Sequence, residues 1–190
     1  MSNGLPPAPD PRSPLGSSRW NGQVYTSHYQ FFLSDRNPQW EDVVRLWTEP
    51  GTMLNRVAVG KGIVLVGAAG YGFKPIELEL LSEPPLADDY QQWDHVTEAS
   101  IDLPSGELYL TEPEGLMGKS LPLAIKSGTY RLRIYYGDVA SAFRDFGPWL
   151  GPLDEGGDHY LVRLWPSSNQ SLPLVLKRWE GWGRIFGGTP

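Results

Sequence analysis

The stretch Pro75-Ile-Glu-Leu-Glu-Leu-Leu81 decides the fold class of this 190-residue chain. Three apolar residues in it alternate with Glu77 and Glu79. Because successive side chains of a strand point to opposite faces, a period of two predicts a strand with one buried and one solvated face. Half-buried strands of this kind are typical of antiparallel sheets.

Strand signals of the same kind recur along the chain and predict an all-β protein. The other predicted strands are Gln23–Leu33, Arg56–Val59, Gly62–Ala68, Val96–Leu103, Glu107–Thr111, Leu121–Lys126, Thr129–Tyr136, His159–Trp165 and Pro173–Lys177. With 22 glycines and 18 prolines available for turns, we expect an antiparallel two-sheet β-sandwich. One short helix is predicted over Pro38–Trp47, with Pro38 near its first turn and Gly51 beyond its end.

A Ser-Gly pair occurs twice in the same setting. In Leu103–Leu110 and in Ile125–Leu132, a strand meets Ser-Gly and a second alternating strand follows. Glycine readily adopts the positive φ that a tight turn needs, so each segment predicts a β-hairpin.

The composition places this body between two tails. Residues 1–19 contain five prolines and predict a Pro-rich flexible tail, residues 20–178 form the β-sandwich domain, and the Gly/Trp-rich residues 179–190 form a C-terminal tail. The N-terminus lacks the charged and apolar regions of a secretory signal, and the apolar run Ile63–Ala69 is too short to span a membrane. With no cysteine to form a disulfide, we expect a cytoplasmic protein.

Acidic residues are concentrated in one part of the chain. Eleven of the 22 acids, and no lysine or arginine, lie between Pro75 and Gly118, so the remaining residues hold 11 acids against 16 bases. A negative block steers a basic protein toward itself and repels nucleic acid and anionic membrane. We therefore expect a basic protein partner, and neither nucleic acid nor membrane.

Two segments mix acids with aromatic residues, which is a sensible composition for a protein interface. The first is Glu83–Asp94, and the second runs from Asp145 to Asp158. The predicted partner-binding residues are Asp88, Asp89, Tyr90, Trp93, Asp94, Trp149, Asp154, Glu155 and Asp158. The alternative is that these acids only make the surface soluble.

Catalytic, cofactor and metal sites are not predicted. The three histidines, His28, His95 and His159, lack the spacing of a metal site, and neighbouring Asp and His residues on a strand point to opposite faces. The glycine-rich stretch Gly67–Gly72 precedes an alternating strand, whereas a phosphate-binding loop precedes a helix. Glu77 and Glu79, with the eight tryptophans, leave open a carbohydrate-binding or carbohydrate-active protein.

Several segments resemble the competence protein J family. They are Thr26–Asp35, Val96–Gly106, Gly128–Tyr136 and Asp158–Pro166. Members of that family are nuclease inhibitors, and similar chains occur as immunity proteins beside bacterial toxins. The resemblance implies an antiparallel β protein that blocks a nuclease by binding it, and it names no inhibitory residue in this sequence. It agrees with the charge argument, because DNA-binding surfaces of nucleases are basic. We therefore expect a non-enzymatic immunity protein or antitoxin.

Overall fold

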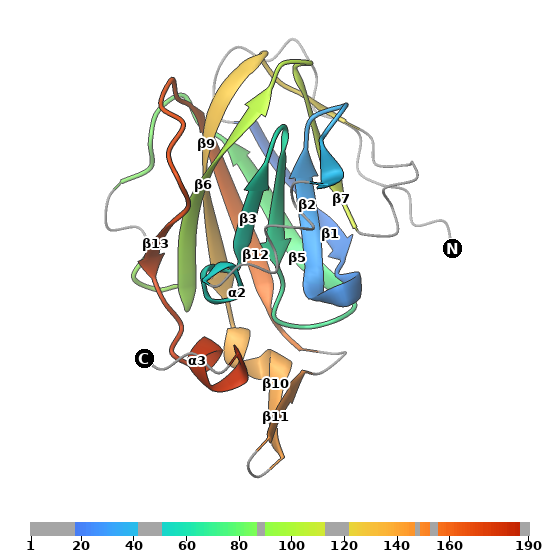
Figure 1. Cartoon of the computed structure of the whole chain (residues 1–190), viewed down its shortest axis with the longest axis vertical. Coiled ribbons are helices and arrows are strands. Elements are labelled where there is room, and N and C mark those ends of the chain that lie inside the picture. Colours follow the sequence, from blue (N-terminus) through green and yellow to red (C-terminus); the bar gives the residue numbers. More distant parts are fainter. Residues whose placement is uncertain are drawn as a thin grey trace.

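The computed structural model describes residues 18–41, 51–86, 90–112, 122–146, 149–152 and 156–186. These residues form a mostly β protein with two principal sheets and few helices, which confirms the all-β prediction (Figure 1). The six-stranded sheet has the order β1 (Ser18–Tyr25), β5 (Phe73–Leu80), β12 (His159–Pro166), β9 (Gly128–Gly137), β6 (His95–Leu103) and β13 (Leu174–Lys177). The five-stranded sheet has the order β3 (Val57–Gly60), β4 (Ile63–Gly67), β2 (Gln30–Ser34), β7 (Glu107–Thr111) and β8 (Leu123–Ala124).

The predicted sandwich is not confirmed. The six-stranded sheet curls into a half-barrel and the five-stranded sheet is not closed. One strand pair also departs from the expected antiparallel order, because β12 runs parallel to β5, with Tyr160 opposite Ile76 and Val162 opposite Leu78. The alternation along β5 predicts which of its side chains are buried. The same alternation occurs beside a parallel or an antiparallel strand, so it does not predict the direction of β12.

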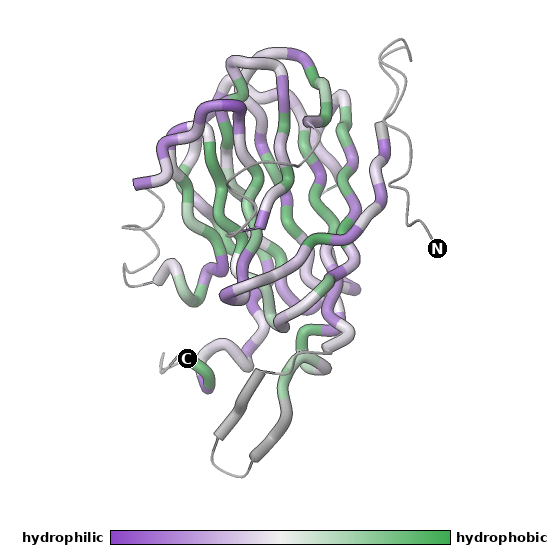
Figure 2. Tube along the Cα trace, turned by 90° about the vertical axis from the view of Figure 1, so that its right-hand side faces the viewer, coloured by the Kyte–Doolittle hydropathy of each residue, from purple (hydrophilic) through white to green (hydrophobic). Residues whose placement is uncertain are grey.

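The core lies inside the curl of the larger sheet. Along β5 the burial alternates as the sequence predicts, with Ile76 and Leu78 buried and Phe73 exposed. Figure 2 shows the same alternation of hydrophilic and hydrophobic residues along several strands. The inner faces of β6, β9 and β12 add Ala99, Ile101, Leu103, Tyr130, Leu132, Ile134, Tyr136, Tyr160, Val162 and Leu164 to the main core. The five-stranded sheet packs against them with Phe31, Leu33, Val57, Val64, Val66 and Leu108.

The predicted strand Gln23–Leu33 is in fact two strands in different sheets. β1 ends at Tyr25, the 3-10 turn η1 (Ser27–Tyr29) follows, and β2 begins at Gln30. His28 and Tyr29 both have a positive φ, of 54° and 56°. The turn carries the chain from the six-stranded sheet into the five-stranded one.

The two Ser-Gly segments are corners between the sheets, and the predicted hairpins are wrong. Ser105-Gly106 joins β6 to β7, and Ser127-Gly128 joins β8 to β9, so each connects strands of different sheets. The corners lie side by side, because Ile125 N donates to the Gly106 oxygen at 2.9 Å. Gly106 has the expected positive φ of 71°, and an added Cβ there would lie 3.0 Å from the Ile125 oxygen. Positive φ therefore marks a sharp bend without revealing which strand comes next.

The remaining elements lie at one end of the sheets (Figure 1). The 3-10 turn η3 (Val139–Ala142) leads into the two-stranded β10 (Phe143–Phe146) and β11 (Trp149–Pro152), which the sequence did not predict. Short helices α2 (Thr52–Asn55) and α3 (Gly181–Phe186) also lie there, and Trp182 of α3 is fully buried, within the predicted C-terminal tail. Most of the predicted helix Pro38–Trp47 lies outside the described residues.

Within the described ranges, no helix has the length and apolar character required to cross a membrane.

Candidate protein-binding surface

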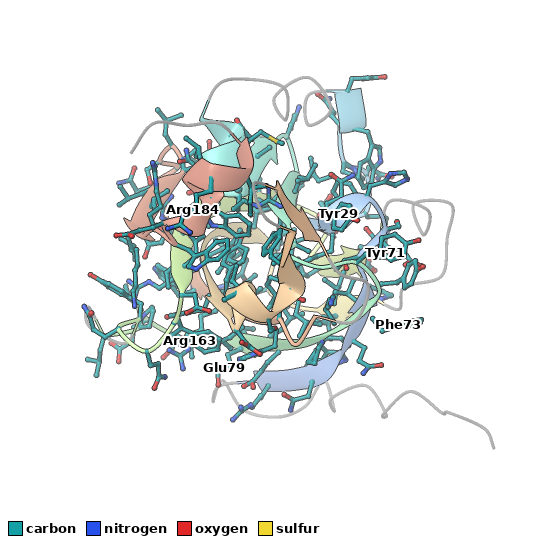
Figure 3. All side chains as sticks on the ribbon, turned by 90° about the horizontal axis from the view of Figure 1, so that it is seen from below. Tyr29, Tyr71, Phe73, Glu79, Arg163 and Arg184 are labelled. Carbon is teal, nitrogen blue, oxygen red and sulfur yellow. The ribbon has the colours of Figure 1, made fainter. Side chains whose placement is uncertain are left out.

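Acids predicted on the solvated faces of strands are paired with arginines of neighbouring strands. Arg163 Nε donates to Glu79 at 2.6 Å, and the two residues are cross-strand neighbours in the parallel pair. Figure 3 shows these two side chains near the lower edge of the view from below. Arg19 of β1 makes an ion pair with Glu77. These contacts neutralise the outer face of the larger sheet at β5.

Glu98 is the most enclosed acid on this outer face. Arg133 Nε donates to Glu98 at 2.8 Å, and Arg131 Nε donates to it at 3.3 Å. Glu107 is likewise held by Arg36, whose hydrogen bonds lower the pKa of that carboxyl. The acid-only stretch is therefore not a continuous unpaired negative surface where the structure describes it.

The segment 81–94 is tied to the outer face of the six-stranded sheet by its backbone. Arg133 Nη1 donates to the Leu86 oxygen at 3.0 Å, and Lys177 Nζ donates to the Gln91 oxygen at 2.7 Å. The Leu86 side chain is nevertheless 84% exposed, and Glu83 is exposed nearby in the chain. This segment therefore presents an exposed apolar side chain, Leu86, and an exposed acid, Glu83.

Tyr90 and Trp93, predicted as partner anchors, are half-buried. Both pack against a small cluster on the outer face of the sheet. The Trp93 ring lies 5.4 Å from Tyr135 and 5.6 Å from His159, between ring centroids. Much of each aromatic ring thus stabilises the chain's own surface, and the exposed remainder is available to a partner.

Asp94 connects the two predicted acidic segments. Its Oδ2 accepts a hydrogen bond from Val139 N at 2.8 Å, and its own N donates to the Tyr136 oxygen at 2.9 Å. Val139 begins η3, which leads directly into β10. Together with the contact between Trp93 and His159, this bond places the end of segment 83–94 at the base of segment 145–158.

Trp149 is the first residue of β11 in the two-stranded ribbon of β10 and β11, which belongs to neither principal sheet. The ribbon projects from the end of the molecule (Figure 1). It is anchored at its base, where the ring of Phe143 stacks on Trp179 with centroids 5.5 Å apart. The predicted contact residues Asp88, Asp89, Asp154 and Glu155 lie outside the described residues.

Asp158 is placed where a surface contact is not possible. Its side chain is 0% exposed and Lys74 is 1% exposed, with Nζ 2.7 Å from Oδ1. Gly70 N donates to Oδ2 at 3.1 Å, and the Tyr160 hydroxyl donates to the same oxygen. Burial, then the neighbouring carboxylate, raises the pKa of Tyr160, which keeps this donor protonated. Because it is buried, Asp158 cannot contact a partner and is left out of the proposed interface. The sequence pattern could not show this, because it did not reveal that Lys74 faces Asp158.

The buried pair fixes the glycine-rich stretch in place. A Cβ at Gly70 would lie 2.5 Å from Lys74 Nζ, so only glycine fits there without a shift. Thr26 closes the other side, with Oγ1 donating to the Gly70 oxygen at 2.8 Å and N donating to the Gly72 oxygen at 2.9 Å. The stretch predicted to be a turn between strands is such a turn, and it is rigidly held.

Sequence reasoning missed an aromatic group beside this turn. Tyr25, Tyr29, Tyr71 and Phe73 form what we call the tyrosine cluster, in which Tyr25 lies 5.4 Å from Tyr71 and 4.9 Å from Phe73 between ring centroids. Phe73 is 68% exposed. Figure 3 shows Tyr29, Tyr71 and Phe73 on one side of the molecule. The only sequence signal was their aromatic character, because strand pairing and η1 bring them together.

The three histidines do not lie together as a metal site. His95 is fully buried, and burial lowers its pKa to about 3. Trp179 N donates to its Nδ1 at 3.3 Å and its Nε2 lies 3.3 Å from the Asn55 oxygen, which assigns the proton to Nε2. His28 and His159 are exposed. Among the described residues, no group of three or more acids and histidines could hold a metal ion.

Glu77 and Glu79 do not form the free carboxylate pair that the carbohydrate-active alternative needs. Each is engaged by an arginine on the outer face of the sheet. A general acid and base of a glycosidase must instead converge on a bound sugar. Glu77 and Glu79 therefore give no support to a carbohydrate-active site.

Comparison with solved structures gives a clear likeness of fold. The structure of ComJ, an inhibitor of the DNA-degrading activity of NucA from Bacillus subtilis, matches 80% of this chain and 99% of its own, with a TM-score of 0.56 and 14% identity. The two chains share a fold. A second structure, described as crocagin biosynthetic gene J, matches 80% of this chain and 97% of its own at a TM-score of 0.47 and 18% identity. No protein-family model matches the sequence, and no curated protein does.

The ComJ match agrees with the family resemblance predicted from the strand segments. At 14% identity it concerns the arrangement of the strands and transfers no contact residue.

Proposed function

We propose that this chain is a non-enzymatic inhibitor that blocks a nuclease by binding it directly, in the manner of an immunity protein. The observation that carries the proposal is the fold, which this chain shares with the nuclease inhibitor ComJ over nearly all of ComJ. Because one fold can serve several functions, the proposal also needs a surface suited to a nuclease.

The proposed contact surface runs along segment 83–94, from Leu86 beside Arg133 of β9 to Asp94 at the base of the β10–β11 ribbon. Leu86 is its exposed apolar anchor, and Tyr90 and Trp93 present their exposed parts farther along the same segment. We include Asp88 and Asp89, which stand between Leu86 and Tyr90 in the sequence, as charges, and Trp149, Asp154 and Glu155 as residues of the second segment. An apolar centre within a charged rim is the usual composition of a protein interface.

Fewer acids are available to attract a basic partner than the sequence of the acid-only stretch suggests. Acids on the strand faces are already paired with arginines, so they offer little attraction to a basic nuclease. Glu83 is exposed between β5 and β6, and Asp88 and Asp89 follow it in the sequence. Rim charges of this kind raise the association rate more than they lower the dissociation rate.

The test is inhibition of DNA cleavage by a nuclease captured on the full-length chain. We expect the captured fraction to cleave DNA after the complex is dissociated, and cleavage to stop when the chain is restored at one molecule per nuclease. Failure of an equimolar amount to stop cleavage would contradict the proposed function.

Variants then locate the surface. Leu86→Ser should weaken binding by about 2 kcal/mol, near thirtyfold, if Leu86 is a central anchor. The matched control is Leu172→Ser, which changes a leucine that is 85% exposed in the 167–173 segment before the edge strand β13. Changing Asp88 and Asp89 to lysine should slow association and reduce its dependence on salt, whereas Glu41→Lys should not. If Leu86→Ser weakens binding no more than Leu172→Ser does, Leu86 is not the central anchor, and the inhibitory function still stands.

A further inference from the structure

The tyrosine cluster has the chemistry of a binding surface for an uncharged, partly apolar ligand. None of its four side chains carries a charge at neutral pH. The Tyr25 hydroxyl donates to the Tyr71 hydroxyl at 2.8 Å, so Tyr71 can direct its own proton to an outside acceptor. With Phe73 exposed beside it, the cluster combines aromatic surface with a hydrogen-bond donor.

The backbone holds the cluster in one arrangement. His28 and Tyr29 are successive non-glycine residues with φ of 54° and 56°, a strained conformation that costs of order 1 kcal/mol for each. On the other side, the buried pair of Lys74 and Asp158 fixes the turn that carries Tyr71. A rigid aromatic surface loses little entropy when a ligand binds.

A proline-rich segment is the ligand that fits these properties. In the polyproline II conformation the backbone makes no internal hydrogen bonds, so its carbonyl oxygens are available to donors such as the Tyr71 hydroxyl. Proline rings pack on aromatic side chains, and domains that recognise such segments present rows of aromatic residues.

This chain contains such a segment, and the segment is long enough to reach from the start of β1 to the tyrosine cluster. Residues 1–17 precede β1 and include Leu5-Pro-Pro-Ala-Pro-Asp-Pro11. β1 is an edge strand whose Ser18 pairs with Leu80 and whose Tyr25 pairs with Phe73, so the cluster lies at the far end of β1.

The seven steps from Ser18 to Tyr25 span about 23 Å at about 3.3 Å each. A polyproline segment running back beside β1 advances about 3.1 Å per residue, so about seven residues cover the same distance. Counted from Ser18, this brings Pro11 and the residues before it to Phe73.

We propose that the tyrosine cluster is a docking site for proline-rich sequence, and that its occupant is the Leu5–Pro11 segment of the same chain. A short tether gives the segment an effective concentration of about 1 mM, so a contact with a Kd near that value is occupied about half the time. Occupancy would cover Phe73 and run along the open edge of β1.

The test uses the full chain labelled with ¹⁵N. The sequence has no cysteine, so Ala8→Cys provides one site for a nitroxide label. We expect the label to remove most of the amide signal intensity of Tyr71, Gly72 and Phe73. In the Phe73→Ser background this loss should be largely abolished, whereas Leu172→Ser, which alters an exposed leucine near the opposite edge of the sheet, should leave it unchanged.

Two results would overturn the proposal. Undiminished signals from Tyr71 to Phe73 would show that the segment does not reach the cluster, as would signal loss that persists with Phe73→Ser. A sample that mixes nitroxide-labelled ¹⁴N chains with unlabelled ¹⁵N chains identifies the source of the segment. Signal loss as strong in the mixture would assign the occupant to a second copy and contradict docking within one chain.

Discussion

Replacing Asp158 with asparagine tests the buried charge pair that supports the glycine-rich turn. Asp158→Asn keeps the shape of the side chain but removes the negative charge 2.7 Å from Lys74 Nζ. Lys74 is 1% exposed, and its ammonium would then face an uncharged amide, with the Gly156 oxygen at 2.9 Å as a further acceptor. Breaking a buried ion pair from one side costs about 3–5 kcal/mol, because the remaining charge is left uncompensated.

A loss of that size is a large fraction of the stability of a domain, which is about 5–15 kcal/mol. Urea unfolding followed by tryptophan fluorescence measures it, since the chain has eight tryptophans. Glu83→Gln is the control for removing a carboxylate, because Glu83 is exposed and its replacement should change the free energy of unfolding by no more than about 0.5 kcal/mol.

The double variant Lys74→Met/Asp158→Asn separates the ion pair from the shape of the site. It removes both charges, so it should be more stable than Asp158→Asn alone. The reasoning would be refuted if Asp158→Asn cost less than about 1 kcal/mol, which is the scale of an ordinary substitution. It would also be refuted if the loss of unfolding free energy in the double variant equalled the sum of the losses in Asp158→Asn and Lys74→Met.

Three further substitutions test other parts of the fold by the same unfolding measurement. Burial lowers the pKa of His95 from 6.5 to about 3, so between these pH values only the unfolded chain takes up the proton. The free energy of unfolding should therefore be unaffected by His95 above pH 6.5 and fall by about 1.4 kcal/mol per pH unit from there toward pH 3. His95→Gln should reduce that slope. Gly106→Ala should cost about 1–2 kcal/mol more than Gly51→Ala, since both have positive φ but only Gly106 has an atom 3.0 Å from the added Cβ. Trp182→Ala should cost about 3–5 kcal/mol, and a negligible loss would show that α3 is not part of the core.

The positions and burial of the strands could be predicted because each depends on local alternation. Glu107–Thr111 coincides with β7, and the other strand segments overlap observed strands. The break inside Gln23–Leu33 could not be predicted, because Thr26-Ser27-His28-Tyr29 contains neither glycine nor proline and alternation continues on both sides. What makes the break is the positive φ of His28 and Tyr29, and Tyr29 is held by Ala68 N, which donates to its oxygen, and by the ring of Tyr71.

Sheet order could not be predicted either, and the site depends on it. β12 lies between β5 and β9, which brings Arg163 opposite Glu79 although the residues are 84 positions apart. A count of acids along the sequence therefore overstates the negative surface. The tyrosine cluster could not be predicted for the same reason, since Tyr25 and Phe73 become neighbours only when β1 pairs with β5.

Asp94 of the proposed interface has both a role predicted from the sequence and a role that only the structure reveals. The sequence predicts it as a charge for a partner, and the structure gives its carboxylate a bond that positions the start of η3. Asp94→Ala would lose both properties at once, so weaker binding by that variant would not identify a charge contact. Asp94→Asn keeps an oxygen to accept the Val139 N–H and removes only the charge. If the carboxylate acts through charge, Asp94→Asn should slow association with a nuclease as much as Asp94→Ala does. If it acts by joining the two segments, Asp94→Asn should bind as the unaltered chain does.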